Sequence, residues 1–398
     1  MNLVAHKYGG SSVATTEKIK NIAAKISIKI SEGYKLIVVV SAMGKTTDGL
    51  IKLAKEITEF PPLREMDMLL STGEQVSASL LSIALNSMGL KSISLNGYQA
   101  GIVTTGEFSE ARIKNFDKEK IQNLLKENDV IVVTGFQGIN EEGELTTLGR
   151  GGSDTSAVAL AAALGITCEI YSDVAGIFTV DPKLHPDAKK IKYITYDEML
   201  ELASLGAKVL HSRSVEIAKK FGIKIYCGST FSDEEGSYVV DEHDIIEQPV
   251  VTGMSVLDNE TQVTINNLPV DFKLVKTIFE KIAAAGLNVD MISIINYEEK
   301  LSVSFTIVED KKHELDKTLN KVLKELEGWK VEYNPDYVKL STVGIGMKSS
   351  VGVASRFFKA LQDIPIKLVT TSEIRISCLI EAKYKQEAVN AIVKEFKL

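Results

Sequence analysis

Short β-branched runs alternate with helical patterns along about the first 230 residues of this chain, and no other feature restricts its fold as strongly. The run at residues 36–40 reads LIVVV, and comparable runs occupy residues 92–95, 130–134 and 167–171. The helical patterns lie at residues 16–31, 75–88, 118–127 and 155–164. Strands separated by helices imply crossover connections, so we expect an α/β fold with a mostly parallel sheet sandwiched by helices. Ligands bind at the carboxyl ends of strands in such sheets, and the Gly-rich segments of this chain follow strands.

An acidic, weakly periodic stretch at residues 231–248 marks a change of pattern, and we interpret it as the end of the first domain. Beyond it, residues 262–335 predict the order strand–helix–strand–strand–helix–strand, which is a ferredoxin-like α+β unit. A second such unit begins near Tyr337 but ends one strand short. A strand at residues 250–256 can complete it, because an unpaired sheet edge is a liability. The expected division is a catalytic domain at 1–245, an inserted unit at 262–335, and a second unit made of 246–261 and 336–398.

Charge and cysteine usage exclude several classes of protein. A net charge of -7 argues against a general nucleic-acid binder, because such a protein is expected to carry a basic stripe. Cys168, Cys227 and Cys378 are far apart and form no metal-binding spacing, as expected in a reducing cytoplasm. The N-terminus lacks the apolar stretch of a signal peptide, and the longest apolar runs are too short to span a membrane. We therefore expect a cytoplasmic protein without a nucleic-acid or membrane partner.

Two glycine-rich segments carry the strongest chemical patterns. The first, HKYGGSSV at residues 6–13, places Lys7 and two glycines ahead of a helix, which is a plausible phosphate clamp. The alternative is a glycine turn with a solvated lysine, and the segment is not a Walker A loop. The second, LGRGGSDTS at residues 148–156, places Arg150 among three glycines. Ser153 or Asp154 could simply cap the next helix, but a guanidinium beside bare backbone suits bidentate capture of a carboxylate.

Other polar positions are weaker on their own. Residues 171–182 (YSDVAGIFTVDP) could cradle a nucleotide, or Asp173 and Asp181 could make Asx-turns. Ser41, Thr47 and Glu74 lie at strand-to-helix junctions, where capping is the alternative role. We interpret the lone His211 as structural.

Taken in order, these segments resemble the aspartate kinases of the amino-acid kinase superfamily. The matching strings are KYGGSSV (7–13), VVVSAMGKTTD (38–48), STGEQVSASL (71–80), TGFQG (134–138), GRGGSDTSA (149–157), YSDVAGIFTVDP (171–182) and GAKVLHSRSV (206–215). The two C-terminal units resemble the tandem ACT domains of this family. The resemblance implies ATP-dependent phosphorylation of the β-carboxylate of L-aspartate, the first step of lysine, threonine and methionine biosynthesis.

The resemblance also implies residue roles. Lys7 would contact the transferring phosphate, and Asp154 would orient Lys7. Arg150 would bind the α-carboxylate of aspartate and Glu74 its α-ammonium. The substrate region would comprise Ser41, Thr47, Glu74, Phe136, Arg150, Gly151, Gly152 and Ser153. The ATP site would comprise Lys7, Tyr8, Gly9, Gly10, Ser11, Ser172, Asp173, Phe178, Thr179, Asp181, Pro182, Lys183 and Lys208, with Mg²⁺ bridging the phosphates and no metal site formed by the protein itself.

The chain departs from the family at Ser212, where proline is usual, and at Ile294, where threonine-sensing relatives carry glutamine. We therefore expect feedback inhibition by L-lysine, with L-threonine as the alternative. The expected effector residues at an ACT interface are Asp290, Ser293, Ile294, Met347, Ser372 and Glu373, although Asp290 and Glu373 could be solvated strand-edge charges. ACT units with short sheets also predict a homodimer or homotetramer.

Two other functions compete. Another carboxylate kinase of the superfamily, such as an N-acetylglutamate kinase, would lack tandem ACT units and would not need Glu74 for an ammonium group. A catalytically dead amino-acid sensor would not need to keep Lys7, Arg150 and Asp154.

Overall fold

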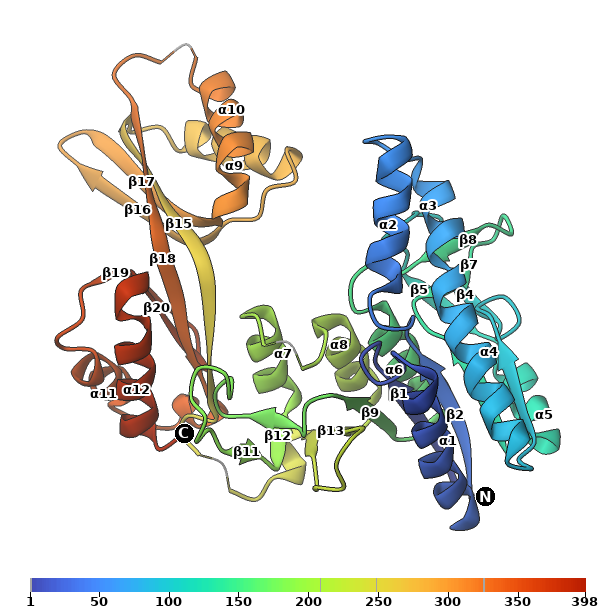
Figure 1. Ribbon diagram of the computed structural model, residues 1–398. Helices are drawn as coiled ribbons and strands as arrows, with labels where there is room; N and C mark the ends of the chain where they lie inside the picture. The colour runs from blue at the N-terminus through green and yellow to red at the C-terminus, as the bar shows by residue number, and fades with distance from the viewer. Residues whose placement is uncertain (1, 208, 248, 325) are drawn as a thin grey trace. The chain divides into compact units, whose positions relative to one another are not determined.

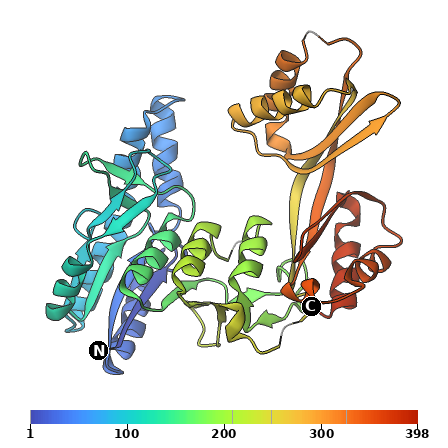
Figure 2. The same ribbon diagram turned by 180° about the vertical axis from the view of Figure 1, so that it is seen from behind.

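The computed structural model describes residues 2–207, 209–247, 249–324 and 326–398 (Figure 1, and from behind in Figure 2). The chain forms two compact units. Met1–Phe178 and Lys190–Glu247 make the first, and Thr179–Lys189 and Gln248–Leu398 make the second. The sequence-based expectation of an α/β region followed by α+β units is confirmed.

An eight-stranded sheet is the centre of the first unit. Its order is β12 (Tyr193–Thr195), β14 (Ser237–Val240), β13 (Ile225–Ser229), β9 (Cys168–Ser172), β1 (Asn2–Tyr8), β2 (Tyr34–Val40), β6 (Val130–Thr134) and β3 (Ser92–Leu95). All neighbours are parallel except β13 and β14. The carboxyl ends of β1, β2, β6 and β9 therefore lie along one edge, where ligands bind in such sheets.

Helices cover both faces of this sheet. α1 (Thr16–Ser31) begins at Thr15, whose hydroxyl accepts the Lys18 N–H. Its apolar face packs with α4 (Thr72–Ser87) on Val4, Val38 and Val132. Alternate residues of a strand point to opposite faces, so Lys7 faces the other side, which α6 (Gly152–Leu164) covers.

The remaining elements of the first unit surround this core. They are α2 (Thr46–Ile57), α3 (Leu63–Leu70), α5 (Lys118–Glu127), α7 (Tyr196–Ser204), α8 (Ser212–Phe221), the hairpin β10 (Ile177–Phe178) with β11 (Lys190–Ile191), and a small sheet in the order β5 (Ile113–Phe116), β4 (Ile102–Thr104), β7 (Gln137–Ile139) and β8 (Leu145–Thr147). The sequence did not predict this small sheet, because strands of three or four residues carry too little periodicity.

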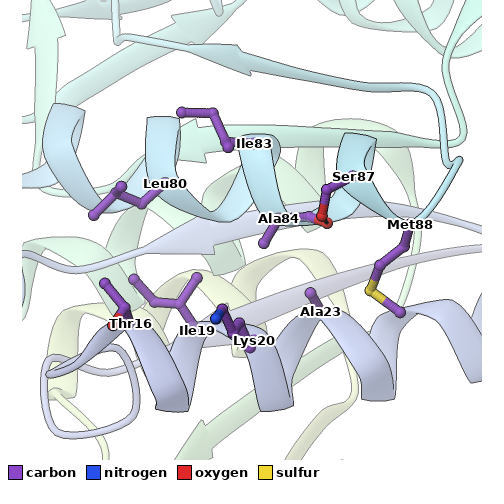
Figure 3. A pocket seen from close by; sticks show the side chains of 9 residues that line it. All are labelled: Thr16, Ile19, Lys20, Ala23, Leu80, Ile83, Ala84, Ser87 and Met88. Carbon is purple, nitrogen blue, oxygen red and sulfur yellow. Dashed lines mark hydrogen bonds between the residues drawn. The ribbon is translucent and has the colours of Figure 1, made fainter.

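An apolar groove of about 370 Å³ runs between α1 and α4 (Figure 3). Ile19, Leu80 and Ile83 line it, and Lys20 is its single charged side chain. The stretch Leu63–Ser87 that contains α4 has the length and composition of a membrane span, but half of its apolar window is buried. Because α4 packs on α1, β3 and β6, we interpret it as a core helix.

The second unit contains one six-stranded antiparallel sheet. Its order is β16 (Asp290–Tyr297), β17 (Lys300–Val308), β15 (Gly253–Pro269), β18 (Lys330–Val343), β20 (Arg375–Glu381) and β19 (Ile366–Thr371). The sequence predicted that the strand at 250–256 is separate from the first strand of the 262–335 unit, and that the last strand of that unit is separate from the first strand of the unit beginning near Tyr337, and this was wrong. Each pair is one long strand, β15 or β18. The polar residues between the predicted strands form irregularities, with Asn259 and Asp336 at φ 61° and 64°, instead of turns.

β15 and β18 thus run through both halves of this unit (Figure 1). In one half, α9 (Phe272–Ala284) and α10 (Lys312–Val322) pack on a core around Phe305. In the other, α11 (Val353–Ala360) and α12 (Lys385–Phe396) pack on a core around Phe357.

The segment Thr179–Lys189 is built into this second core. Val180 is 1% exposed and packs in the cluster around Phe357. The Thr179 carbonyl accepts the Met254 N–H at 2.7 Å, and the Leu184 carbonyl accepts the Gln386 side-chain amide at 3.0 Å. No sequence pattern marks this segment as part of the second unit.

Candidate active site

Lys7 and Asp154 form an ion pair at the carboxyl end of β1. The Lys7 ammonium lies 2.6 Å from Asp154 Oδ1, and the two side chains are 11% and 13% exposed. Asp154 belongs to the first turn of α6, where the helix dipole also favours a negative charge. The capping alternative for Asp154 is not borne out, because α6 has Gly151 as its N-cap residue and no side-chain cap.

The loops after β1 and β2 pack directly on one another beside this pair. The Gly44 N–H donates to the Gly10 carbonyl at 3.0 Å, and the Ser41 N–H donates to the Tyr8 carbonyl at 3.1 Å. A Cβ on Gly10 would lie 2.9 Å from the Ala42 carbonyl oxygen, so only glycine fits there. A Cβ on Gly9 would lie 3.5 Å from Lys7 Nζ, which places bare backbone next to the ammonium group.

Glu74 is a buried carboxylate with an unsatisfied oxygen. It lies in the first turn of α4 and is 3% exposed. Oε1 accepts the Ala42 N–H at 3.1 Å, whereas Oε2 has no hydrogen-bond partner among the described residues. Burial raises the pKa of Glu74 to about 7, although the Ala42 hydrogen bond opposes the shift. A buried carboxylate without a full set of donors is a strong indication of a ligand site.

Arg150 presents an unpaired guanidinium. Its side chain is exposed, and no hydrogen bond or ion pair joins it to any other residue in the described part of the chain. Gly149 and Gly151 on either side have φ of 72° and 68°, a conformation that favours glycine. A Cβ on Gly151 would lie 2.1 Å from the His211 ring, so His211 packs directly on this loop.

The segment after β6 connects these groups. The Gly135 N–H donates to the Val40 carbonyl at 3.0 Å, and a Cβ on Gly135 would lie 2.8 Å from Ser153. Phe136 has φ of 70°, which is unusual for a bulky residue and typical of functional sites. The ends of β2 and β6 and the start of α6 therefore converge on one place.

Sequence reasoning missed Thr134 and the residues that follow β13. Thr134 ends β6 and is 1% exposed, and its hydroxyl has no partner among the described residues. The Thr230 hydroxyl bonds the Ser12 hydroxyl at 2.7 Å, which ties the Lys7 loop to the end of β13. A polar residue at the end of a strand or directly after it was the pattern that could have found both.

A cavity of about 350 Å³ opens beside Asp154. Gly151, Ala203, Leu210, His211 and Ser212 also line it. The groove between α1 and α4 is slightly larger but nearly all apolar, so it does not suit a phosphate. Of the groups described above, Gly151, Asp154 and His211 line the smaller cavity, whereas Lys7, Glu74 and Arg150 do not.

The expected nucleotide residues are distributed over several segments. The Ser172 hydroxyl accepts the Val174 N–H at 3.1 Å, and Asp173 is exposed. Tyr8 is buried in the core, stacked on Tyr171 with ring centroids 5.3 Å apart, so only its backbone faces the loop. Gly9, Gly10 and Ser11 follow in that loop, and Phe178 lies in β10.

Four of the other predicted nucleotide residues fall outside the first unit. Thr179, Asp181, Pro182 and Lys183 belong to the second unit. Asp181 accepts the Lys183 N–H at 2.9 Å, as the Asx-turn alternative predicts. Lys208 lies outside the described residues.

The expected effector residues lie in the second unit. The Asp290 carboxylate pairs with the ammonium group of Lys339, which is 4% exposed. Burial acts to raise the pKa of Asp290, but the hydrogen bond and charge of Lys339 outweigh it and lower that pKa. Glu373 is largely exposed and lies 3.6 Å from Lys348, as a surface charge would. Ser293 and Ile294 lie on β16, Met347 packs on the core around Phe357, and the Ser372 N–H donates to the Arg375 carbonyl.

Among the described residues, no group of three His, Cys, Asp or Glu side chains comes together as a metal site. A lysine–aspartate pair at the end of the parallel strand β1, a glycine backbone beside it, and an arginine before α6 without a polar partner among the described residues are features of a phosphoryl-transfer enzyme. The amino acid kinase family model matches residues 2–229, and an ACT domain model matches residues 340–396.

Similarity to known proteins identifies the family within this class of enzyme. The chain is 47% identical to the aspartokinase of Geobacillus stearothermophilus, covering 100% of this chain and 98% of that protein. It is 43% identical to aspartokinase 2 of Bacillus subtilis, covering 100% and 98%. Escherichia coli aspartokinase III, solved with aspartate and ADP, has the same fold, with a TM-score of 0.82, 23% identity and 100% coverage of both chains. The chain therefore belongs to the amino acid kinase family and, within it, to the aspartokinases.

Proposed function

We propose that this chain transfers the γ-phosphate of ATP to the β-carboxylate of L-aspartate, giving 4-phospho-L-aspartate and ADP. The observation that carries the proposal is that one unit contains both a guanidinium without a polar partner among the described residues and a buried carboxylate with one oxygen that accepts no hydrogen bond from them. Arg150 suits the α-carboxylate of an amino acid, and Glu74 Oε2 suits its α-ammonium. Relatives that are aspartokinases along their whole length support the same substrate.

The chemistry needs positioning and charge stabilisation more than proton transfer. An oxygen of the ionised β-carboxylate attacks the γ-phosphorus, and the bond from that phosphorus to the bridging oxygen of ADP breaks. ADP leaves with the bonding electron pair. Lys7 neutralises charge as it develops on the phosphoryl oxygens, and Asp154 holds Lys7 in place. Because the nucleophile is already ionised at neutral pH, no general base is required.

The remaining binding roles are proposed from the resemblance to the aspartate kinases. Ser41, Thr47, Phe136, Gly151, Gly152 and Ser153 would complete the aspartate and γ-phosphate region. Gly9, Gly10, Ser11, Ser172, Asp173 and Phe178 would hold the nucleotide, with Thr179, Asp181, Pro182, Lys183 and Lys208 as further contacts. Mg²⁺ would enter with ATP, held mainly by phosphate oxygens, because Mg²⁺ in such sites keeps few protein ligands.

Regulation is proposed through the ACT units, which would comprise residues 262–335 as an insertion and residues 246–261 with 336–398. L-lysine is the favoured effector and L-threonine the alternative. A structure of Escherichia coli aspartokinase III holds lysine together with aspartate, which supports the former for that protein. In this chain, the ammonium of an effector at Asp290 would have to displace Lys339. A cytoplasmic homodimer or homotetramer is part of the same proposal.

The test is aspartate-dependent ADP formation by the purified chain. We expect turnover with L-aspartate and none with N-acetyl-L-aspartate or N-acetyl-L-glutamate, which lack the ammonium that Glu74 would bind. We expect Lys7→Ala to lower kcat by about 10²–10³ while the protein stays folded. Lys52→Ala, on the exposed side of α2, is the matched control. Phosphorylation of an N-acetylated substrate in preference to aspartate would refute the substrate assignment.

A further inference from the structure

Asp67 of α3 is a fully buried carboxylate that receives four hydrogen bonds. It is 0% exposed. Oδ2 accepts the backbone N–H groups of Ser109 at 2.9 Å and Thr147 at 2.8 Å. Oδ1 accepts the hydroxyls of the same residues at 3.1 and 2.7 Å. Burial of a charge is tolerated only with such complete satisfaction, so both partner residues are held firmly.

One partner belongs to the segment that leads to Arg150, and the other contacts Gly149, the residue before Arg150. Thr147 ends β8, three residues before Arg150. Ser109 lies between β4 and β5 and has φ of 68°, a strained conformation for serine that its two bonds to Asp67 stabilise. A Cβ on Gly149 would lie 3.0 Å from the Ser109 carbonyl oxygen, so the two segments are in close contact.

Other contacts hold the residues between Thr147 and Arg150. The Leu148 N–H donates to the Phe136 carbonyl at 2.9 Å. The Arg213 guanidinium donates to the carbonyls of Leu148 and Ala111. Arg150 itself has no polar partner among the described residues, so its backbone alone determines where its side chain starts.

We propose that Asp67 is a positioning residue for substrate recognition, which fixes residues 147–149 and thereby the place at which Arg150 presents its guanidinium. The inference rests on the proposed function, in which Arg150 binds the α-carboxylate of aspartate. A bidentate guanidinium–carboxylate contact depends on geometry, and a displacement of about 1 Å can cost about 10²-fold in rate. An amide cannot replace Asp67, because its NH₂ group would face two of the four donors.

The experiment compares Asp67→Asn with a milder variant and a matched control. Thr147→Val removes one of the four hydrogen bonds and keeps the β-branched shape of the strand residue. Glu198→Gln alters a different buried carboxylate of the same unit, which is 1% exposed and bonds the backbone and hydroxyl of Thr195. For each protein, steady-state kinetics with aspartate or ATP varied are measured beside thermal unfolding.

We expect Asp67→Asn to raise the aspartate KM at least about tenfold, with the ATP KM changed by less than about twofold. Thr147→Val should raise the aspartate KM in the same direction by a smaller factor. Glu198→Gln should lower the Tm and leave both KM values unchanged. If Asp67 had only a structural role, all three variants would have a lower Tm, and none would raise the aspartate KM more than the ATP KM.

If Asp67→Asn is too unstable to purify, Thr147→Val decides the question alone. An unchanged aspartate KM in the folded variants, or equal rises in both KM values, would overturn the inference while wild-type activity upholds the proposed function. An inactive wild-type protein would overturn the proposed function and this inference with it.

Discussion

Glu74 shows how one buried oxygen can connect stability with recognition. Its burial was not predictable, because Glu74 in STGE could equally have capped a helix, and burial depends on the packing of Ala42 and Gly73 around it. Lys7 and Arg150, by contrast, stood out among glycines in the sequence and lie where that pattern placed them, at strand ends. Asp67 was not recognised at all, since its four hydrogen-bond donors belong to two residues, Ser109 and Thr147, which are 42 and 80 positions away.

We predict that the apparent affinity for aspartate rises with pH through about 7. The pKa of Glu74 is about 7 in the protein, and only its ionised form attracts the substrate ammonium. kcat/KM for aspartate should therefore rise between about pH 6 and 8. Glu74→Gln should raise the aspartate KM and abolish this limb of the pH profile. If the rise in kcat/KM with pH persists in Glu74→Gln, a group other than Glu74 causes it.

The same pKa shift predicts the sign of a stability change. Because burial raises the folded pKa above the unfolded value of 4.5, ionising Glu74 weakens folding progressively above about pH 4.5, and the loss is complete above about pH 7. Glu74→Gln should therefore increase the Tm at pH 8 relative to wild type, and much less at pH 5. Thermal unfolding at the two pH values checks this, and an equal change at both would contradict it.

Arg150→Lys should be a severe change. A lysine ammonium cannot form the two parallel hydrogen bonds of a guanidinium, so we expect the aspartate KM to rise by about tenfold to a hundredfold and the ATP KM by much less. Arg112→Lys makes the same exchange at another exposed arginine, on the loop before β5, and should be neutral. Equal effects of Arg150→Lys on both substrates would mean that Arg150 serves ATP or the fold.

At the scale of elements, the long helices and the buried parallel strands were predictable because their periodicity extends over several residues. α1 begins and ends where its pattern does. The small sheet was missed because its strands are too short to show a period. β15 and β18 were each divided in two because Asn259 and Asp336 are residue types that favour turns, although here they lie in bulged strands. Local preference indicated a break, and pairing with both neighbouring strands overrode it.

The packing of the loop after β1 on the loop after β2 yields a prediction at this scale. Gly10→Ala would place a Cβ 2.9 Å from the Ala42 carbonyl and 3.3 Å from the Gly44 carbonyl. The two loops must separate, and we expect kcat to fall about tenfold or more with little change in far-UV circular dichroism. Gly106→Ala, at a glycine with open space around it, is the control and should retain full activity.

At the scale of the whole molecule, β16 is an edge strand of its sheet with an apolar surface. Ile292, Ile294 and Ile295 are 49%, 40% and 57% exposed. Exposed apolar edge strands tend to pair with a second chain. We predict that Ile295→Lys shifts the protein toward monomer in sedimentation velocity at micromolar concentration. Ile28→Lys, at an equally exposed isoleucine of α1, should not, and a wild-type monomer would contradict the prediction.

The path of the chain through Thr179–Lys189 has a consequence for how such a protein can be recombined. The polypeptide enters the second unit at Thr179, returns at Lys190 and leaves the first unit again after Glu247. A single crossover near residue 247, joining this catalytic region to the ACT region of a relative, would separate Val180 and Leu184 from the core in which they pack. A functional chimaera would need to exchange residues 179–189 together with the C-terminal region. In recombination between relatives, the coding sequences for residues 179–189 and for the C-terminal region must therefore be inherited together.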